Sequence, residues 1–185
     1  MKIIIFMIFI IAGSLNSCIQ APTSPSQVPI ISMEKTLPIL NERAKEWDRG
    51  ANLWDIRISL DSPPEDRRSY ELLSASYQSP SKNYETLLLS LMSSDSIFEE
   101  VFNYETPIIQ SRPLTKDDWV YDSPEALKIF LENDQIQKDL REFELHALKL
   151  NRLGIWTLNI IKPDFKGSKY YSLDPKTNEI DEIIK

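Results

Sequence analysis

The chain has 185 residues, with 21 Lys and Arg against 28 Asp and Glu, and 42% of its residues are hydrophobic. This is enough for one ordinary domain or two very small ones, and the composition excludes wholesale disorder. Four glycines leave no material for a glycine-rich phosphate loop, and one His with one Cys cannot form a structural zinc site or a disulfide. The net charge of -7 argues against non-specific nucleic-acid binding. We therefore expect no cofactor, no metal and no nucleic acid.

The N-terminus has the features of a secretory signal. Lys2 precedes an apolar run over residues 3–12, which is roughly half of the ~20 residues that a membrane-spanning helix needs. The run ends in LNSC, from Leu15 to Cys18, which resembles the lipobox of bacterial lipoproteins. The resemblance implies that residues 1–17 are removed and that Cys18 carries diacylglycerol and an N-acyl chain such as palmitate. It also implies a lipid-anchored protein of the bacterial cell envelope, with the outer membrane favoured in a Gram-negative cell because Ile19 follows Cys18.

Residues 18–36 form the next segment, which contains several prolines among small polar residues. Prolines restrict the backbone and favour extended conformers, so this segment is expected to be a semi-rigid tether between the membrane and the folded part.

A first α+β unit is expected over residues 37–92. Apolar residues spaced by three or four predict a helix from Leu37 to Trp47 that ends near Gly50. Strict alternation then predicts a strand over residues 54–60. Two further strands are expected, over residues 69–77 and 85–91.

Residues 93–117 show no persistent period and are expected to connect this unit to a second one over residues 118–185. The second unit begins with Ser123 as a helix cap and Pro124 at the first helical position. An apolar stripe extends this helix to about Asn151, with an interruption near Asn133. Strands follow around residues 156–160, 171–173 and 179–184.

The two halves share one order, a helix and then strands, and Trp54 and Trp156 each open the first predicted strand of a half. This favours a duplication, with a coincidental recurrence of simple elements as the alternative. The stretches DWVYDSPEAL (118–127), WTL (156–158) and YSLDPKTNEI (171–180) are similar to the PepSY-like pattern. The resemblance implies an α+β fold with helices packed on small antiparallel sheets in two related units. It also implies an envelope module that binds or inhibits. Asn178 stands where that pattern usually has Gly, and Asn tolerates the left-handed conformation of such a turn.

Catalytic chemistry finds little support. His146 falls within the predicted long helix, where a lone His is usually a surface or half-buried residue, and no G-x-S-x-G motif accompanies it. The acidic pairs are expected to be solvated, because adjacent residues point in different directions. These pairs are Glu99 with Glu100, Asp117 with Asp118, and Asp181 with Glu182.

Trp119 and Tyr121 precede the second helix in an irregular segment and are the aromatic residues most expected to be exposed for binding. The favoured function is a non-catalytic binding or inhibitory module, held at a membrane by the lipid on Cys18, with a protein or peptide partner. Two alternatives remain open: an immunity protein against a secreted toxin, and an envelope hydrolase.

Overall fold

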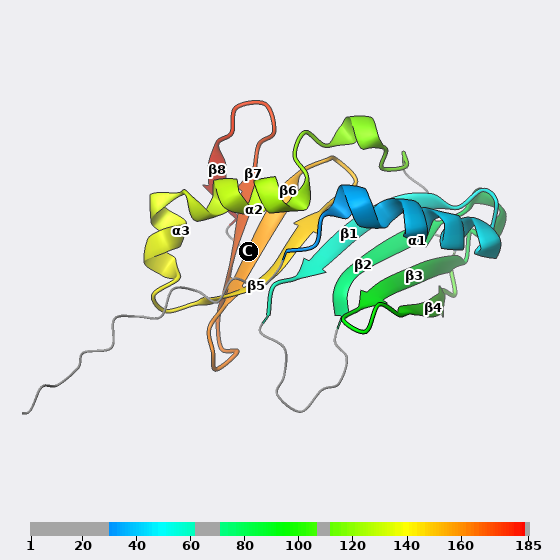
Figure 1. Ribbon diagram of the computed structural model, residues 1–185, viewed down its shortest axis with the longest axis horizontal. Coiled ribbons are helices and arrows are strands. Elements are labelled where there is room, and N and C mark those ends of the chain that lie inside the picture. The colour runs from blue at the N-terminus through cyan, green and yellow to red at the C-terminus, as the bar shows by residue number, and fades with distance from the viewer. Residues whose placement is uncertain (1–29, 62–70, 107–111, 184–185) are drawn as a thin grey trace, which may run out of the picture.

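The computed structural model describes residues 30–61, 71–106 and 112–183 (Figure 1). The predicted signal segment, Cys18 and most of the predicted tether lie outside these ranges. The elements are, in chain order, α1 (Met33–Trp47), β1 (Asn52–Ser59), β2 (Glu71–Gln78), the 3-10 turn η1 (Pro80–Lys82), β3 (Glu85–Met92), β4 (Ile97–Asn103), the 3-10 turn η2 (Lys116–Asp118), α2 (Ser123–Leu131), α3 (Asp134–Asp139), β5 (Glu144–Leu150), β6 (Trp156–Ile161), β7 (Ser168–Leu173) and β8 (Ile180–Glu182).

All eight strands belong to one antiparallel sheet, in the order β4-β3-β2-β1-β5-β6-β7-β8. The α+β class is therefore confirmed, whereas the expectation of separate small sheets is wrong. The two halves meet where β1 pairs with β5, from Ile56 opposite Leu150 to Ser59 opposite Ala147. Buried backbone N–H and C=O groups need partners, and β2 satisfies only one edge of β1. Pairing with β5 satisfies the other edge and merges the two halves.

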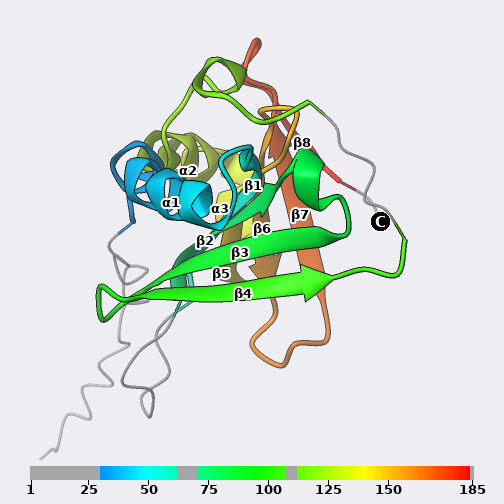
Figure 2. The ribbon, with the colours of Figure 1, turned by 90° about the vertical axis from the view of Figure 1, so that its right-hand side faces the viewer.

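The helices lie on one face of this sheet, and the other face carries none of them (Figures 1 and 2). α1 covers the half built from β1 to β4, and α2 with α3 covers the half built from β5 to β8. Figure 2 shows β3 and β4 running at a steep angle to β6 and β7, as the right-handed twist accumulates over a large sheet. β4 and the three-residue β8 form the two edges.

A single hydrophobic core fills the space between the helices and the sheet. Its largest fully buried side chains come from both halves and include Tyr77 on β2, Phe130 on α2 and Trp156 on β6. Trp156 donates its indole N–H to the carbonyl of Tyr121 at 3.0 Å, which satisfies its only polar atom. Each fully buried large apolar side chain contributes about 1.5–3 kcal/mol, so the shared core holds the halves together.

The N-termini of α1 and α2 meet head to head on Asp122 and Ser123. The Asp122 carboxylate accepts hydrogen bonds from Ser123 N (2.8 Å), Glu34 N (3.1 Å) and Ser32 Oγ (2.5 Å). The fully buried Ser123 hydroxyl accepts from Met33 N (2.9 Å) and donates to Ile31 O (2.6 Å). Asp122, and not Ser123 as the sequence predicts, is therefore the cap of α2. Ser123 instead joins the two helices.

The predicted long helix over residues 123–151 is wrong in its second half. Asn133 caps a separate short helix, α3, with bonds to Gln135 N (2.9 Å) and Ile136 N (3.2 Å). Residues 144–150 then form β5, which places His146 on a strand. The pairing of β5 with β6 shifts register between Leu145 and Ala147. This irregularity breaks the period of two that marks a strand in the sequence.

Two other expectations change at the unit boundaries. The predicted connecting segment, residues 93–117, contains the strand β4. The last residues of the predicted tether belong to the fold, because α1 begins at Met33 and both Ile30 and Ile31 pack against the core. Trp54 lies on β1, the first strand of its half, whereas Trp156 opens β6, the second strand of its half. The two tryptophans are therefore not equivalent.

The other predicted strands are confirmed within a few residues at their ends. Asn178 adopts a φ of 61°, as expected for the turn before β8.

At the far end of the helix layer, α3 is fastened to β7 through Asp139. Its carboxylate accepts hydrogen bonds from Lys169 Nζ at 2.8 Å, from Gln135 Nε2 at 3.2 Å and from the Tyr171 hydroxyl. Burial alone would raise the pKa of Asp139, but the hydrogen bonds from Lys169, Tyr171 and Gln135 outweigh it and lower the pKa. Burial, with the neighbouring carboxylate, raises the pKa of Tyr171.

Replacing Asp122 tests the helix junction. Asp122→Ala removes the cap of α2 and an acceptor for α1, so we expect the free energy of unfolding to fall by about 2 kcal/mol. The control Asp117→Ala removes an exposed carboxylate of η2 and should change it by less than about 0.5 kcal/mol. Urea denaturation followed by circular dichroism measures both, and equal effects would contradict the junction.

Replacing Asp139 tests the contact between α3 and β7 through its pH dependence. A carboxyl with a lowered pKa in the folded state stabilises the protein above its unfolded-state pKa, about 3.9, and loses this contribution as the pH falls through the folded-state pKa. The stability advantage of the wild type over Asp139→Asn should therefore be largest near neutral pH and shrink below about pH 4. An advantage that does not change with pH would show that ionisation of Asp139 is irrelevant to folding.

Candidate functional site

The two aromatic residues predicted to bind a ligand are half-buried. Trp119 and Tyr121 both pack against the core, and the side chain between them, Val120, is the exposed one at 63%. The Tyr121 hydroxyl donates to Asn178 Oδ1, and its carbonyl accepts from Trp156. Tyr121 therefore links the segment before α2 to the turn before β8, and a binding role for either residue stays a prediction.

Trp119 lines a groove of about 380 Å³ between α1 and residues 113–119. Its indole nitrogen is buried and has no hydrogen-bond partner within the described ranges. Leu37 and Leu53 contribute apolar walls, and Lys45 and Lys116 contribute charge. The groove therefore has both apolar and charged walls, but its polar groups do not converge on one point in a way that would indicate a particular ligand.

His146 lies between two charged side chains on the helix-free face of the sheet. Its Nδ1 is 2.7 Å from Asp61 Oδ1, and its Nε2 is 3.2 Å from an amine of Arg57. Because Arg can only donate, Nε2 accepts and Nδ1 carries the proton that it donates to Asp61. Both ring nitrogens are thus engaged, one by Arg57 of β1 and the other by Asp61 just after β1, and these contacts link the end of β1 to β5.

Acidic residues do not assemble into a site in the described part of the chain. There, no three His, Cys, Asp or Glu side chains lie close enough together to hold a metal ion. Glu99 and Glu100 point to opposite faces of β4, as expected for adjacent strand residues.

The most distinctive surface is an aromatic stripe along β4. Phe98 and Phe102 lie on the same side of the strand, and Tyr104 comes directly after its end. Tyr84 lies opposite Tyr104, whose N–H donates to the Tyr84 carbonyl at 2.8 Å. The exposed fractions of these residues are 54%, 41%, 49% and 46%. We call these four residues the aromatic stripe.

The stripe lies on the helix-free face. On β3, Leu87 and Leu89 are fully buried beneath the helices, and they pair with Val101 and Glu99 of β4. The intervening residues of β4 therefore point to the other face, since successive side chains alternate. Clustered exposed aromatic residues are typical of protein-binding surfaces.

Next to Phe98, the neighbouring strands carry small polar residues on the same face. Phe98 pairs with Ser90 on β3, which pairs in turn with Ser74 on β2. Both serines donate to the Glu71 carboxylate, at 2.8 Å and 3.3 Å respectively. Leu88, opposite Glu100, adds an apolar side chain to the same face.

α1 holds the strands that carry the stripe from the opposite face. Arg43 of α1 donates from Nε to Glu99 Oε2 at 3.1 Å, which pins the inner side of β4. This ion pair is half-exposed, so its role is to orient the strand and not to supply much stability.

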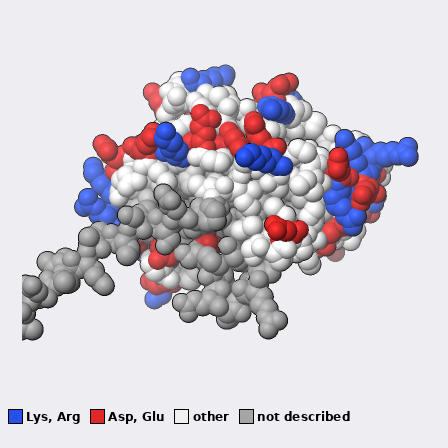
Figure 3. All heavy atoms as spheres, viewed as in Figure 1, with Lys and Arg blue, Asp and Glu red and all other residues white. Residues whose placement is uncertain are grey.

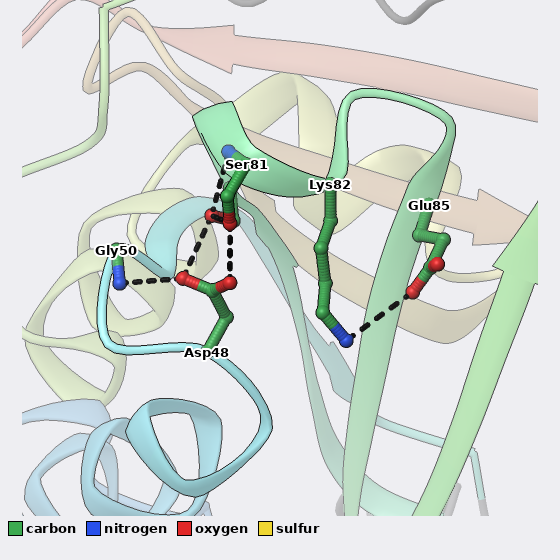
Figure 4. A network of polar contacts seen from close by, with 6 residues as sticks. Asp48, Gly50, Ser81, Lys82 and Glu85 are labelled. Atoms are coloured by element: carbon green, nitrogen blue, oxygen red, sulfur yellow. Dashed lines mark hydrogen bonds and ion pairs between the residues drawn. The ribbon is translucent and has the colours of Figure 1, made fainter.

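The end of α1 is tied to the turn before β3 by Asp48 (Figure 4). Its carboxylate accepts from the Ser81 hydroxyl, from Gly50 N at 2.6 Å and from Ser79 Oγ at 2.9 Å, and these bonds lower the pKa of Asp48. Lys82 from the same turn pairs with Glu85 at 3.5 Å. The turn so fixed leads directly into Tyr84 and β3.

The helix-covered face has a different character. Acidic and basic side chains are interspersed over it, without a field of one sign (Figure 3). No helix within the described ranges is long and apolar enough to span a membrane.

Comparison with known proteins does not assign the chain to a family. The sequence matches no protein-family model, and neither a curated protein nor a solved structure matches it.

The aromatic stripe is absent from the sequence-based predictions, although a signal exists. Phe98, Phe102 and Tyr104 have the same parity, which is the spacing of one strand face. Val101, on the opposite face, obscures the alternation, and the nearby prolines made the stretch look like a connection.

Replacing the stripe separates function from folding. The double variant Phe98→Ser with Phe102→Ser should lower the free energy of unfolding by less than about 2 kcal/mol, because the two rings are only about half buried. Leu89→Ala, in the neighbouring buried position, should cost about 3 kcal/mol. Urea denaturation compares them, and binding of the dye anilinonaphthalene sulfonate should fall only in the double variant. A cost for the stripe as large as that for Leu89→Ala would make the stripe structural.

Proposed function

We propose that the protein is a lipid-anchored bacterial envelope protein that binds another protein through the aromatic stripe and has no catalytic activity. The observation that carries the proposal is a row of four exposed aromatic side chains, two on the helix-free face of the edge strand β4 and two, Tyr104 and Tyr84, directly beside its end. Such a surface is costly to leave in water, and a partner that covers it would relieve that cost.

Anchoring rests on the lipobox-like LNSC segment that ends at Cys18. An acylated cysteine carrying more than one chain would hold the protein stably at a membrane face, since each buried methylene contributes about 0.8 kcal/mol. Residues between Cys18 and α1 would then set the distance of the binding surface from the bilayer. Outer-membrane sorting in a Gram-negative cell is part of this proposal.

The strand order supports a PepSY-like duplication. Read from the centre, the order is β1, β2, β3, β4 on one side and β5, β6, β7, β8 on the other, and helices precede each set. A duplicated unit whose first strands pair with each other produces this symmetric order. The proposal therefore treats the chain as two related units with one shared sheet.

An inhibitory role fits the same surface, either toward an envelope partner or as immunity against a secreted toxin. The acidic balance of the chain favours a basic partner in either case. The hydrolase alternative has less support, because both ring nitrogens of His146 are engaged by Asp61 and Arg57.

The experiment uses the full chain in a bacterium, with the photo-cross-linker benzoylphenylalanine in place of Phe98. We expect an adduct of discrete mass that is lost when Phe102→Ser is added, because the partner must cover the stripe. The matched control places the cross-linker at Lys128 on α2, whose side chain is 74% exposed on the opposite face, and should yield none.

The same cells test the anchor. The wild type should lose residues 1–17, gain acyl mass and partition into detergent, whereas Cys18→Ala should stay unprocessed or leave the detergent phase. Adducts of equal yield at positions 98 and 128 would overturn the binding role. A soluble wild type without acyl chains would overturn the anchor alone.

A further inference from the structure

Within the part of the chain that the structure describes, no strand pairs with the outer edge of β4, and this edge presents a definite set of backbone groups. Tyr104 N donates to Tyr84 O at 2.8 Å and Met92 N donates to Ser96 O at 2.9 Å, at the two ends of the β3–β4 pair. Hydrogen-bonded and non-hydrogen-bonded pairs alternate in an antiparallel ladder, so the even-numbered residues of β4 bond to β3. The N–H and C=O groups of the odd-numbered residues therefore point outward, at Ile97, Glu99, Val101 and Asn103.

This edge is built to accept another strand. β4 has seven residues, its register with β3 is continuous, and it contains no proline. Edge strands that avoid pairing are usually short, bulged or interrupted by proline, and the other edge, β8, is only three residues long. Figure 2 shows β4 extended along the rim of the sheet.

The charge on β4 defines what can pair there. Glu99, on the helix side, is compensated by Arg43. Glu100 lies on the helix-free face between Phe98 and Phe102, and within the described ranges it has no ion-pair partner. Along the helix-free face of β4, the acidic Glu100 therefore lies between two aromatic side chains of the stripe.

We propose that β4 binds an extended segment of a basic partner protein as an added strand. A Lys or Arg of that segment lies beside Glu100, and apolar residues two positions to either side cover Phe98 and Phe102. Backbone hydrogen bonds to the outward N–H and C=O groups provide affinity, and the side chains provide selectivity. This inference rests on the proposed function, since it specifies how the aromatic stripe engages its partner.

A second copy of this chain fits the edge less well. Two antiparallel copies of β4 centred on Glu100 would place like charges directly opposite each other, which is destabilising. Two chains that each carry a net charge of -7 also repel one another. A basic partner segment removes both penalties.

The charge preference is tested with a short blocked peptide as the probe. One face of the peptide carries isoleucine, lysine and isoleucine at alternate positions, with threonine between them, and a matched peptide carries glutamate in place of the lysine. Calorimetry with the wild type should show binding of the lysine peptide about tenfold tighter than the glutamate peptide. Glu100→Lys should reverse this order. No saturable binding of the lysine peptide up to about 1 mM, or an unchanged order in Glu100→Lys, would overturn the proposal.

Strand addition itself is tested at Val101, whose N–H points outward. Val101→Pro removes this donor without removing a bond to β3, and edge strands tolerate such a proline. It should abolish peptide binding, whereas Val101→Ala should retain it within about threefold and thus control for the lost side chain. Circular dichroism and urea denaturation confirm that both variants fold.

The outcomes distinguish this inference from the proposed function. If Val101→Pro binds the peptide like Val101→Ala, or still forms the cross-link from position 98 in cells, strand addition is wrong while the stripe remains a docking surface. If the cross-link is missing in the wild type, the proposed function itself fails. A dimer of the wild type that sedimentation detects and that Val101→Pro abolishes would mean that a second copy occupies the edge, which also overturns the basic-partner proposal.

Discussion

One carboxylate stands between two helix N-termini, and the arrangement of the helix layer depends on it. The first turn of a helix exposes unpaired N–H groups and carries a partial positive charge, so two such ends facing each other would repel. Asp122 accepts from the backbone of both helices, and Ser123 completes the contact through Met33 N and Ile31 O. In the helix layer this junction does what the β1–β5 pair does in the sheet: it joins the halves of the chain.

The position of the candidate binding surface follows from that junction. Because its first turn is held at α2, α1 extends across the half of the sheet built from β1 to β4. There Arg43 forms an ion pair with Glu99, and Asp48 accepts hydrogen bonds that fix the turn before β3. The first contact acts on the helix side of β4, and the second fixes the turn that leads into β3. Neither contact involves the outer side of the sheet, so the rings of the stripe lie on a strand that α1 holds from the opposite face.

Much of the fold could be predicted because most strands carry one alternating face. β6 alternates cleanly, β1 alternates from Ile56 to Ser59, and the turn at Asn178 follows from the tolerance of Asn for positive φ. β5 could not be predicted, since Glu, Leu, Ala and Lys favour helices and the irregularity at His146 disrupts the period of two. Gly154 shows a long-range constraint of another kind: a Cβ there would lie 1.6 Å from the carbonyl oxygen of Asp118, a contact that only the folded structure creates.

The candidate site was hidden for a related reason. A strand that is buried on one face can be recognised in the sequence by alternating apolar and polar residues. β4 instead carries apolar residues on both faces: Val101 points toward the helices, and the aromatic stripe points away from them. An edge strand of this kind promotes aggregation unless something restrains it. Glu100 in the middle of the stripe provides one restraint, because two copies that pair centred on it oppose like charges, while a basic segment gains an ion pair at the same position. The same side chain therefore disfavours self-association and favours a partner of opposite charge, which is the combination that a specific docking strand requires.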